Sequence, residues 1–217
     1  MAVLHGAEQY GPALTQQLVS EPMDCIFGDL DGDLDLDMIE GHRAGNSKLY
    51  INNGGFFVDA TAGNFPPDSN TYSYDLGDLD GDGDLDVFGA NSGVGSREAV
   101  FQNDGNASFT NVTSTVLPNS SNPNIDDNDS KFLDYDNDGD LDILVLRGAW
   151  LKSYGQQPNS LLRNDGHGRF RDVTFLAGLG EHHFPTQTAA WADYDNDGDL
   201  DIILAAASGV VVLRNHG

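Results

Sequence analysis

Short apolar runs separated by turn residues extend along most of the chain. Examples are CIF at 25–27, VFGA at 87–90 and ILVL at 143–146. Because these runs are rich in β-branched and aromatic residues and lack a helical period, they predict strands. Other stretches, such as VFQNDGNASFTNVT at 100–113, place two strands around an Asn-Gly or Asp-Gly turn. Such a pattern predicts a β-hairpin.

The hairpin pattern repeats at 49–61, 100–113 and 161–174, and it begins again at 212–217. A phenylalanine and a threonine occupy matching places in the three full copies, as Phe57, Phe109 and Phe170 and as Thr61, Thr113 and Thr174. With a strand on each side of an acidic loop before it, one unit has four strands. A four-stranded antiparallel sheet cannot bury both faces alone, and radial stacking of such sheets solves this. We therefore expect an all-β fold, a β-propeller with about four visible four-stranded antiparallel blades.

The 217 residues predict a single β-propeller domain with repeats at approximately 24–66, 71–118, 128–180 and 185–217. Residues 1–23 are either a closing strand or the remnant of a preceding blade. If Ala2 to Leu4 pair with residues 210–214, four blades close the ring. Otherwise the chain is a fragment of a larger propeller or half of a dimer.

An acidic phrase of nine residues occurs four times, at 29–37, 78–86, 134–142 and 193–201. Aspartate occupies places one, three, five, seven and nine of every copy, and place six is glycine in three copies and Leu34 in the first. The aspartates are Asp29, Asp31, Asp33, Asp35 and Asp37; Asp78, Asp80, Asp82, Asp84 and Asp86; Asp134, Asp136, Asp138, Asp140 and Asp142; and Asp193, Asp195, Asp197, Asp199 and Asp201.

Five carboxylates in a compact loop repel one another unless a cation lies among them. Ca²⁺ prefers six to eight oxygen ligands in a flexible loop, so the phrases predict up to four Ca²⁺ sites. We expect the side chains at places one, three and five, the carbonyl at place seven and the carboxylate at place nine to bind the ion. Glycine at place six permits positive φ. Because Leu34 does not adopt it without cost, we expect the site at Asp29–Asp37 to be distorted, weaker or empty, and the weakest of the four.

These loops differ from EF-hands, which need a glutamate at place twelve between two helices. Only the first copy has a glutamate at place twelve, Glu40, and that copy lacks the glycine. The other copies have Gly89, Val145 and Leu204 there, and each loop is followed by β-branched, apolar residues. The loops are therefore predicted to connect strands.

The formal net charge is −25, from 10 basic and 35 acidic residues. Such a chain repels nucleic acid and anionic membranes, and no apolar run is long enough to span a membrane. We expect neither a nucleic-acid partner nor membrane insertion. The single cysteine, Cys25, excludes an internal disulfide framework and is expected to pack in the core.

The first residues, MAVLHGAEQYG, lack the features of a signal peptide. Low-affinity calcium loops suit the millimolar calcium found outside cells. Four N-x-S/T sequons, at Asn106, Asn111, Asn119 and Asn128, are compatible with secretion. We expect an extracellular or cell-surface protein.

The combination of D-x-D-x-D-G-D-x-D loops with N-x-G-x-x-F-x-D-V-T hairpins resembles the FG-GAP/VCBS repeat family, the blades of integrin-α-type β-propellers. The resemblance covers nearly all of residues 24–217. It implies a calcium loop between the first two strands of each blade, all on one rim. It also implies extracellular adhesion or recognition of a ligand. The departures are Leu34 and the small number of blades.

Because the calcium loops occupy one face, a protein or glycan ligand is expected on the opposite face. The longest connections there are 117–130, 147–159 and 178–187. Aromatic side chains stack on sugars, and basic side chains bind carboxylates. The candidates are Arg147, Trp150, Lys152, Tyr154, His182 and His183.

Two hypotheses from different classes follow. The first is a non-enzymatic, calcium-binding recognition module, which self-associates or joins the remaining blades of a longer chain. The second is a propeller-scaffold polysaccharide lyase or other carbohydrate-active protein, with His182 or His183 as base, Tyr154 as acid and Arg147 on a uronate. No nucleophile elbow, phosphate loop or zinc cluster is visible in the sequence, so we favour the first.

Overall fold

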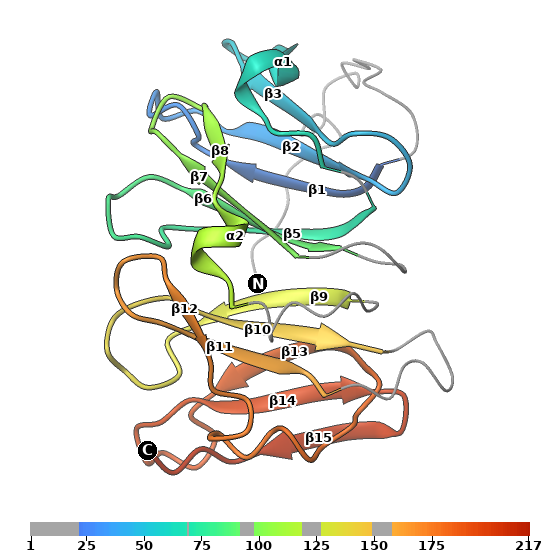
Figure 1. Ribbon diagram of the computed structural model, residues 1–217, viewed down its shortest axis with the longest axis vertical. Helices are drawn as coiled ribbons and strands as arrows, with labels where there is room; N and C mark the ends of the chain where they lie inside the picture. The colour runs from blue at the N-terminus through green and yellow to red at the C-terminus, as the bar shows by residue number, and fades with distance from the viewer. Residues whose placement is uncertain (1–21, 69, 92–97, 119–126, 149–157) are drawn as a thin grey trace, which may run out of the picture.

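Each sequence repeat forms one antiparallel sheet, which confirms the prediction of an all-β propeller architecture (Figure 1). The computed structural model describes residues 22–68, 70–91, 98–118, 127–148 and 158–217. We call the four sheets blades one to four. The proposed strand at Ala2 to Leu4 lies outside the described residues.

Among the described residues, the first three blades have four strands each, and blade four has three. Blade one contains β1 (Pro22–Gly28), β2 (Asp37–His42), β3 (Lys48–Asn52) and β4 (Phe57–Asp59), then the helical turn α1 (Thr61–Asn64). Blade two contains β5 (Thr71–Gly77), β6 (Asp86–Asn91), β7 (Ala99–Asn103) and β8 (Phe109–Asn111), then α2 (Thr113–Val116). Blade three contains β9 (Asp127–Leu133), β10 (Asp142–Arg147), β11 (Ser160–Asn164) and β12 (Phe170–Asp172). Blade four contains β13 (Thr186–Ala192), β14 (Asp201–Ala206) and β15 (Gly209–Leu213).

The repeated threonine holds the end of the hairpin to its third strand. In blade one, the backbone N–H of Leu49 donates to Thr61 Oγ1 at 3.0 Å, and the N–H of Thr61 donates to Asp59 Oδ1 at 3.0 Å. Thr113 and Thr174 accept in the same way from Val100 and Leu161. The F-x-D-x-T pattern therefore encodes a capped turn that follows the fourth strand.

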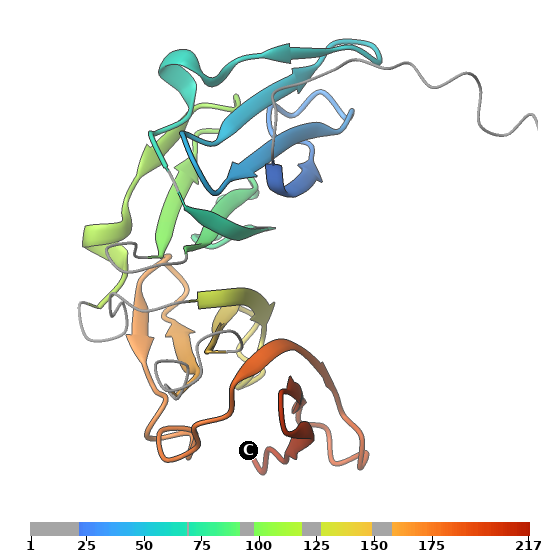
Figure 2. The ribbon, with the colours of Figure 1, turned by 90° about the vertical axis from the view of Figure 1, so that its right-hand side faces the viewer.

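The blades follow one another along an arc that is open on one side (Figure 2). The first strands of consecutive blades are neighbours, β1 beside β5, β5 beside β9 and β9 beside β13. Three apolar clusters lie at the three boundaries between blades. Ile39 of blade one, for example, packs with Tyr74 and Val87 of blade two. Each sheet therefore buries its apolar side chains against the neighbouring sheets.

Cys25 is exposed, so the prediction that it packs in the core is wrong. Along β1 the side chains alternate, and those of Met23, Cys25 and Phe27 are exposed. In blades two and three the residues aligned with Cys25 are Tyr74 and Ser130, and both are buried against the preceding blade. Cys25 is exposed because no described blade precedes blade one.

No helix among the described residues is long and apolar enough to cross a membrane.

Candidate metal centre

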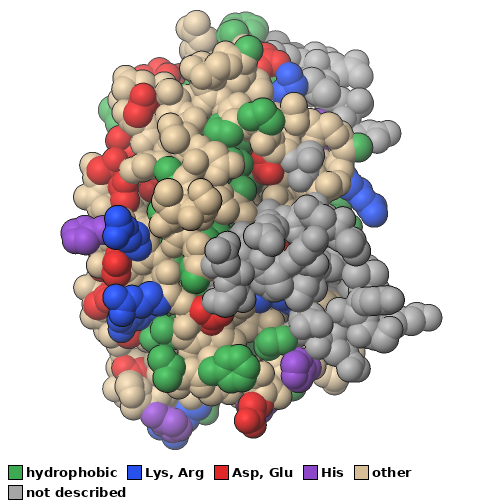
Figure 3. All heavy atoms as spheres, in the orientation of Figure 1, with side chains coloured by type: hydrophobic (Ala, Val, Ile, Leu, Met, Phe, Trp, Pro, Cys, Tyr) green, Lys and Arg blue, Asp and Glu red, His purple; other side chains and the backbone are tan. Residues whose placement is uncertain are grey.

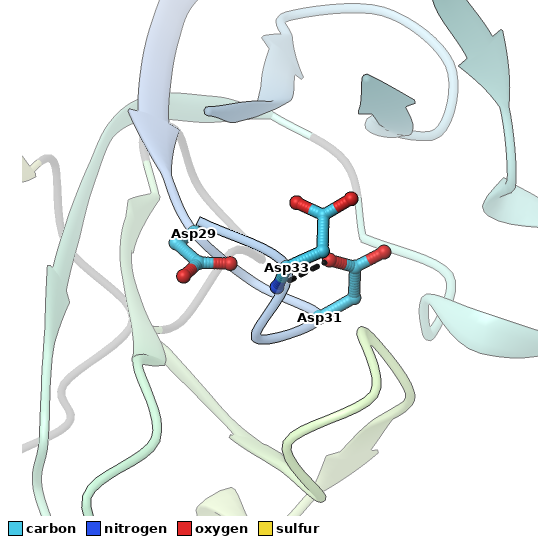
Figure 4. A group of neighbouring side chains, drawn as sticks. All are labelled: Asp29, Asp31 and Asp33. Carbon is cyan, nitrogen blue, oxygen red and sulfur yellow. Dashed lines mark hydrogen bonds between the residues drawn. The ribbon is translucent and has the colours of Figure 1, made fainter. Parts of the chain in front are cut away.

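The four acidic phrases form the loops that connect the first and second strands of each blade, and they share one backbone pattern. In loop one, Asp29 Oδ1 accepts from Gly32 N at 2.9 Å and Asp29 Oδ2 from Leu34 N at 3.1 Å. The bond from place six to the first aspartate recurs at 3.1 Å in the other loops, from Gly83, Gly139 and Gly198. Figure 4 shows that the loop curls so that three carboxylates face one region.

Carboxylate oxygens converge in every loop. One oxygen from each member of a group lies within 4.8 Å of the others. The groups are Asp29, Asp31 and Asp33; Asp78, Asp80 and Asp86; Asp134, Asp136 and Asp142; and Asp193, Asp195 and Asp197. The first and third places therefore belong to all four groups, the fifth place to two and the ninth place to two.

The ninth aspartates have a structural role that the spacing of the loops does not reveal. Asp37 Oδ2 accepts from Leu30 N at 2.9 Å, and Asp37 Oδ1 accepts from Asn52 N at 2.8 Å. The ninth aspartate is at most 1% exposed in each blade. Asp86, Asp142 and Asp201 make the same pair of bonds, so each ninth carboxylate ties its loop to the end of the third strand, or in blade four to Asn215 just after it.

The seventh aspartates, Asp35, Asp84, Asp140 and Asp199, lie outside these groups. A Cβ atom added at Gly105 would lie 2.4 Å from Asp84 Oδ2, and one added at Gly166 would lie 2.6 Å from Asp140 Oδ2. The seventh carboxylate thus packs against the turn between the third and fourth strands. Both glycines also have positive φ, so this contact and the backbone both require glycine there.

Leu34 adopts the left-handed conformation that glycine has in the other loops, so the backbone of loop one follows the same path at this place. Its φ is 73°, compared with 96° at Gly83 and 97° at Gly139 and Gly198. The side chain is 91% exposed and gains no packing in return. A left-handed leucine costs about 1–2 kcal/mol relative to its preferred conformations.

We predict that Leu34→Gly raises the free energy of unfolding by about 1 kcal/mol, because it removes this strain and the gain exceeds the added freedom of the unfolded chain. Leu36→Gly is the matched control, since Leu36 is also exposed but has no left-handed backbone. It should destabilise by about 0.5–1 kcal/mol. Urea unfolding of both variants in EDTA checks this, and equal losses of stability would contradict it.

Burial raises the pKa of the ninth carboxyl groups in two loops. The pKa of Asp86 rises to about 7 and that of Asp142 to about 7, because removal from water disfavours the charged form more than the backbone N–H bonds favour it. Burial followed by repulsion from neighbouring aspartates also raises the pKa of Asp80 and Asp136. A nearby cation stabilises the charged form of such carboxyl groups the most.

Side chains from the third strands, or in blade four from the residue just after it, reach the aspartate at place three in three of the loops. Gln102 donates to Asp80 Oδ2, Arg163 lies 3.5 Å from Asp136 Oδ2, and Arg214 contacts both Asp195 and Asp197. The corresponding residue of blade one is Ile51. An ion in loops three and four would share its carboxylates with an arginine, and an ion in loop one would not.

The residues present fit a calcium ion. Oxygens bound at 2.3–2.6 Å to one ion lie within about 5 Å of one another, as the grouped oxygens do. All the grouped side-chain ligands are carboxylates, the donors that hard divalent cations prefer. Figure 3 shows acidic side chains gathered along the edge of the molecule that carries these loops.

An asparagine of the following blade holds each of the first three loops. Asn103 Nδ2 donates to Leu30 O at 2.9 Å, Asn164 Nδ2 to Leu79 O at 2.8 Å and Asn215 Nδ2 to Tyr135 O at 3.0 Å. The signal in the sequence was the asparagine that begins each hairpin turn, which we interpreted only as a turn residue. It also joins blades.

The candidates for a ligand face are not brought together among the described residues. Arg147 is 1% exposed and pairs with Asp127 at 2.7 Å and Glu98 at 2.6 Å, so it lies away from the surface where a ligand was expected. His182 and His183 are exposed, and His182 stacks on Phe184 with ring centroids 5.4 Å apart. Trp150, Lys152 and Tyr154 lie outside the described residues.

A groove of about 710 Å³ lies between blades three and four. Arginine, tyrosine and leucine side chains line it, among them Arg163, Arg171, Arg214, Tyr135 and Leu176. Its size is in the range of small-ligand sites, and it combines apolar surface with hydrogen-bond donors. Local sequence patterns do not reveal this groove, because its walls come from residues as far apart along the chain as Tyr135 and Gly217.

The sequence model of the FG-GAP-like repeat matches residues 29–89, 78–145 and 134–204. The chain belongs to the FG-GAP-like repeat family. This confirms the resemblance stated from the loops and hairpins. No curated protein matches this FG-GAP-like repeat chain.

A solved structure of an Agrocybe aegerita lectin matches the chain with a TM-score of 0.53 and 23% identity. That lectin specifically recognises non-reducing terminal N-acetylglucosamine. The match covers 89% of this chain and 50% of that chain, so this FG-GAP-like repeat chain spans about half the length of the lectin. At this level of identity the likeness shows the fold alone.

Proposed function

We propose that this chain is a calcium-binding FG-GAP-like propeller module that recognises a glycan outside the cell and catalyses no reaction. The observation that carries the proposal is the fourfold convergence of carboxylate oxygens within 4.8 Å at the same place in each blade. In this role Ca²⁺ neutralises the loops and stabilises the fold, since binding to the folded state alone adds to stability.

Glycan recognition is supported by the groove between blades three and four and by the fold shared with a glycan-binding lectin. Tyr135 and Leu176 offer apolar surface to a sugar ring, while Arg171 and Asn215 offer donors to its hydroxyl groups. A protein ligand remains the second partner class. A lyase is disfavoured because Arg147, the group assigned to a uronate, is buried and already paired.

Titration with CaCl₂ in a calorimeter tests the metal part of the proposal. We expect saturable binding with dissociation constants on the order of 10⁻⁴–10⁻³ M, as in extracellular calcium modules. The absence of calcium binding at 10 mM CaCl₂ would contradict the metal part of the proposal.

A glycan array probed in 2 mM CaCl₂, with N-acetylglucosamine-terminated glycans included, tests the ligand. For a bound glycan, Arg171→Ala should weaken binding by about tenfold, the effect of losing a charged hydrogen-bond donor. Arg169→Ala is the control, because Arg169 is exposed on the same blade and does not line the groove. Equal affinity of the two variants would place the ligand elsewhere, and an array without signal would refute glycan recognition.

A further inference from the structure

The four acidic loops share one backbone pattern but differ in one side chain that lies beside them. The residue directly before the hairpin asparagine is Ile51, Gln102, Arg163 or Arg214 in blades one to four. These residues occupy equivalent positions, because the asparagine after each of them donates its backbone N–H to the ninth aspartate of its own loop. The chain thus carries four natural variants of one contact.

In loop four the arginine joins two of the carboxylates that converge. Arg214 Nε pairs with Asp195, and Arg214 Nη2 donates to Asp197 Oδ2 at 3.2 Å. Both aspartates belong to the group of loop four whose oxygens lie within 4.8 Å of one another. The guanidinium therefore supplies positive charge to two of the three carboxylates that would bind an ion there.

Loop three has the same contact with one carboxylate. Arg163 Nη1 donates to Asp136 Oδ2 at 3.5 Å, and Asp136 belongs to the group of loop three. The side chains of Arg163 and Arg214 are 38% and 48% exposed, so water weakens both ion pairs. A divalent cation can therefore compete with each arginine for the carboxylates, but the arginine stays near the ion.

Loops one and two receive no charge at this position. Gln102 offers Asp80 a neutral amide. Ile51 packs against the apolar cluster between blades one and two. Within the part of the chain that the structure describes, no lysine, arginine or histidine pairs with an aspartate of loop one. The three grouped carboxylates in Figure 4 thus receive no positive charge from the described side chains.

We propose that this one side chain sets the calcium affinity of each loop, and that Arg163 and Arg214 make loops three and four the weaker pair. This order rests on the calcium binding proposed above. A guanidinium nitrogen 3.2–3.5 Å from a carboxylate oxygen lies within about 6 Å of an ion bound to that oxygen. Repulsion between the two cations at this distance, screened by salt, weakens binding by about three- to tenfold.

The order differs from the one expected from Leu34. Leu34 already has the left-handed backbone of the other loops without an ion, so its conformational cost is present in the free and the bound state alike. A cost that is the same in two states does not change the equilibrium between them. The charges of Arg163 and Arg214, in contrast, oppose the bound state alone. Loops one and two should therefore fill first.

Terbium luminescence excited through tyrosine reports on loops three and four. Tyr135 and Tyr194 hold place two of these loops, between the first two aspartates, whereas Leu30 and Leu79 hold it in loops one and two. Terbium binds to the oxygen ligands of calcium sites and emits when a nearby tyrosine transfers energy to it. The part of the signal that is lost in Tyr135→Phe with Tyr194→Phe belongs to loops three and four.

The double variant Arg163→Gln with Arg214→Gln tests the proposal, because glutamine is the residue beside loop two. The half-saturating terbium concentration of loops three and four should fall at least about threefold, and calorimetry with CaCl₂ should show two sites tighter by about three- to tenfold. Arg43→Gln is the control, since Arg43 is exposed beyond the end of β2 that lies away from loop one. It removes the same charge and should leave both affinities unchanged.

The outcomes separate this order from calcium binding itself. Calcium binding that is equally strong in the wild type and the double arginine variant would overturn the order alone. The absence of calcium binding in every variant would overturn the proposed function and the order with it.

Ile51→Arg tests the converse in loop one. The new guanidinium occupies the position of Arg163 in blade three, and it should weaken the tightest calcium site by about three- to tenfold. Ile51→Gln is the matched variant, because it removes the same apolar packing without adding charge. Circular dichroism verifies that both variants are folded. Equal calcium affinities of Ile51→Arg and Ile51→Gln would contradict the proposal.

Discussion

Removal of calcium with excess EDTA is expected to lower the melting temperature by roughly 10–25 °C. At a calcium concentration ten times the dissociation constant, one site stabilises the fold by about 1.4 kcal/mol, and four sites by about 6 kcal/mol. A domain of this size shifts by about 2–4 °C per kcal/mol. The grouped carboxylates repel one another without the ion, which acts in the same direction.

Differential scanning calorimetry with and without EDTA checks this expectation. Asp80→Asn keeps the shape of one ligand and removes its charge, so it should reduce the shift by about a quarter. Asp104→Asn is the control, because Asp104 is an exposed acid in a turn outside the loops. An unchanged melting temperature of the wild type in EDTA would contradict the proposal that calcium stabilises the fold.

The pH dependence of the free energy of unfolding should differ between the calcium-free and the calcium-bound protein. The pKa values of Asp86 and Asp142 are about 7 in the folded protein and near 4 when unfolded. The metal-free folded state therefore binds more protons between about pH 4 and pH 7, and its stability falls as the pH rises through that window. Calcium binds the deprotonated carboxylates, so the loss of stability between pH 4 and pH 7 should be smaller when calcium is present.

Arg147→Met is expected to destabilise the protein by about 3–5 kcal/mol, the second large effect. The guanidinium is buried between Asp127 of its own blade and Glu98 of blade two. Burial raises the pKa of both carboxyl groups, because removal from water disfavours their charged forms more than the guanidinium they share favours them. Removal of the arginine leaves two buried acids without a counter-charge.

Two further variants separate this loss from a general effect of losing a cation. Lys48→Met removes a partly exposed pair with Asp59 and should cost no more than about 1 kcal/mol. Adding Glu98→Gln and Asp127→Asn to Arg147→Met removes the uncompensated charges and should restore much of the stability. Urea unfolding measures all of them, and losses of equal size for Arg147→Met and Lys48→Met would refute the assignment.

The local patterns of the sequence were sufficient for the strands, the hairpins and the position of the acidic loops. They predicted the convergence of the first and third aspartates because each loop repeats the same spacing. The paired bonds of the ninth aspartate were missed, since its partner on the third strand, Asn52 in blade one, lies 15 residues away.

Contacts between blades were the part that local patterns could not show. Arg147 and Glu98 are 49 residues apart and meet only because two sheets pack side by side. The exposure of Cys25 likewise depends on whether another blade lies in front of β1. Leu34 was judged from the intrinsic preference of leucine alone, and the backbone bonds of the loop outweigh that preference.

The hydrogen bond from each hairpin turn to the loop of the blade before it has a thermodynamic consequence. An ion that orders loop one fixes Leu30 O, and through Asn103 it fixes the turn that adjoins loop two. Part of the entropy cost at loop two is then already met, so filling one loop raises the affinity of its neighbour. The calcium isotherm of this protein should accordingly be steeper than that of four independent sites.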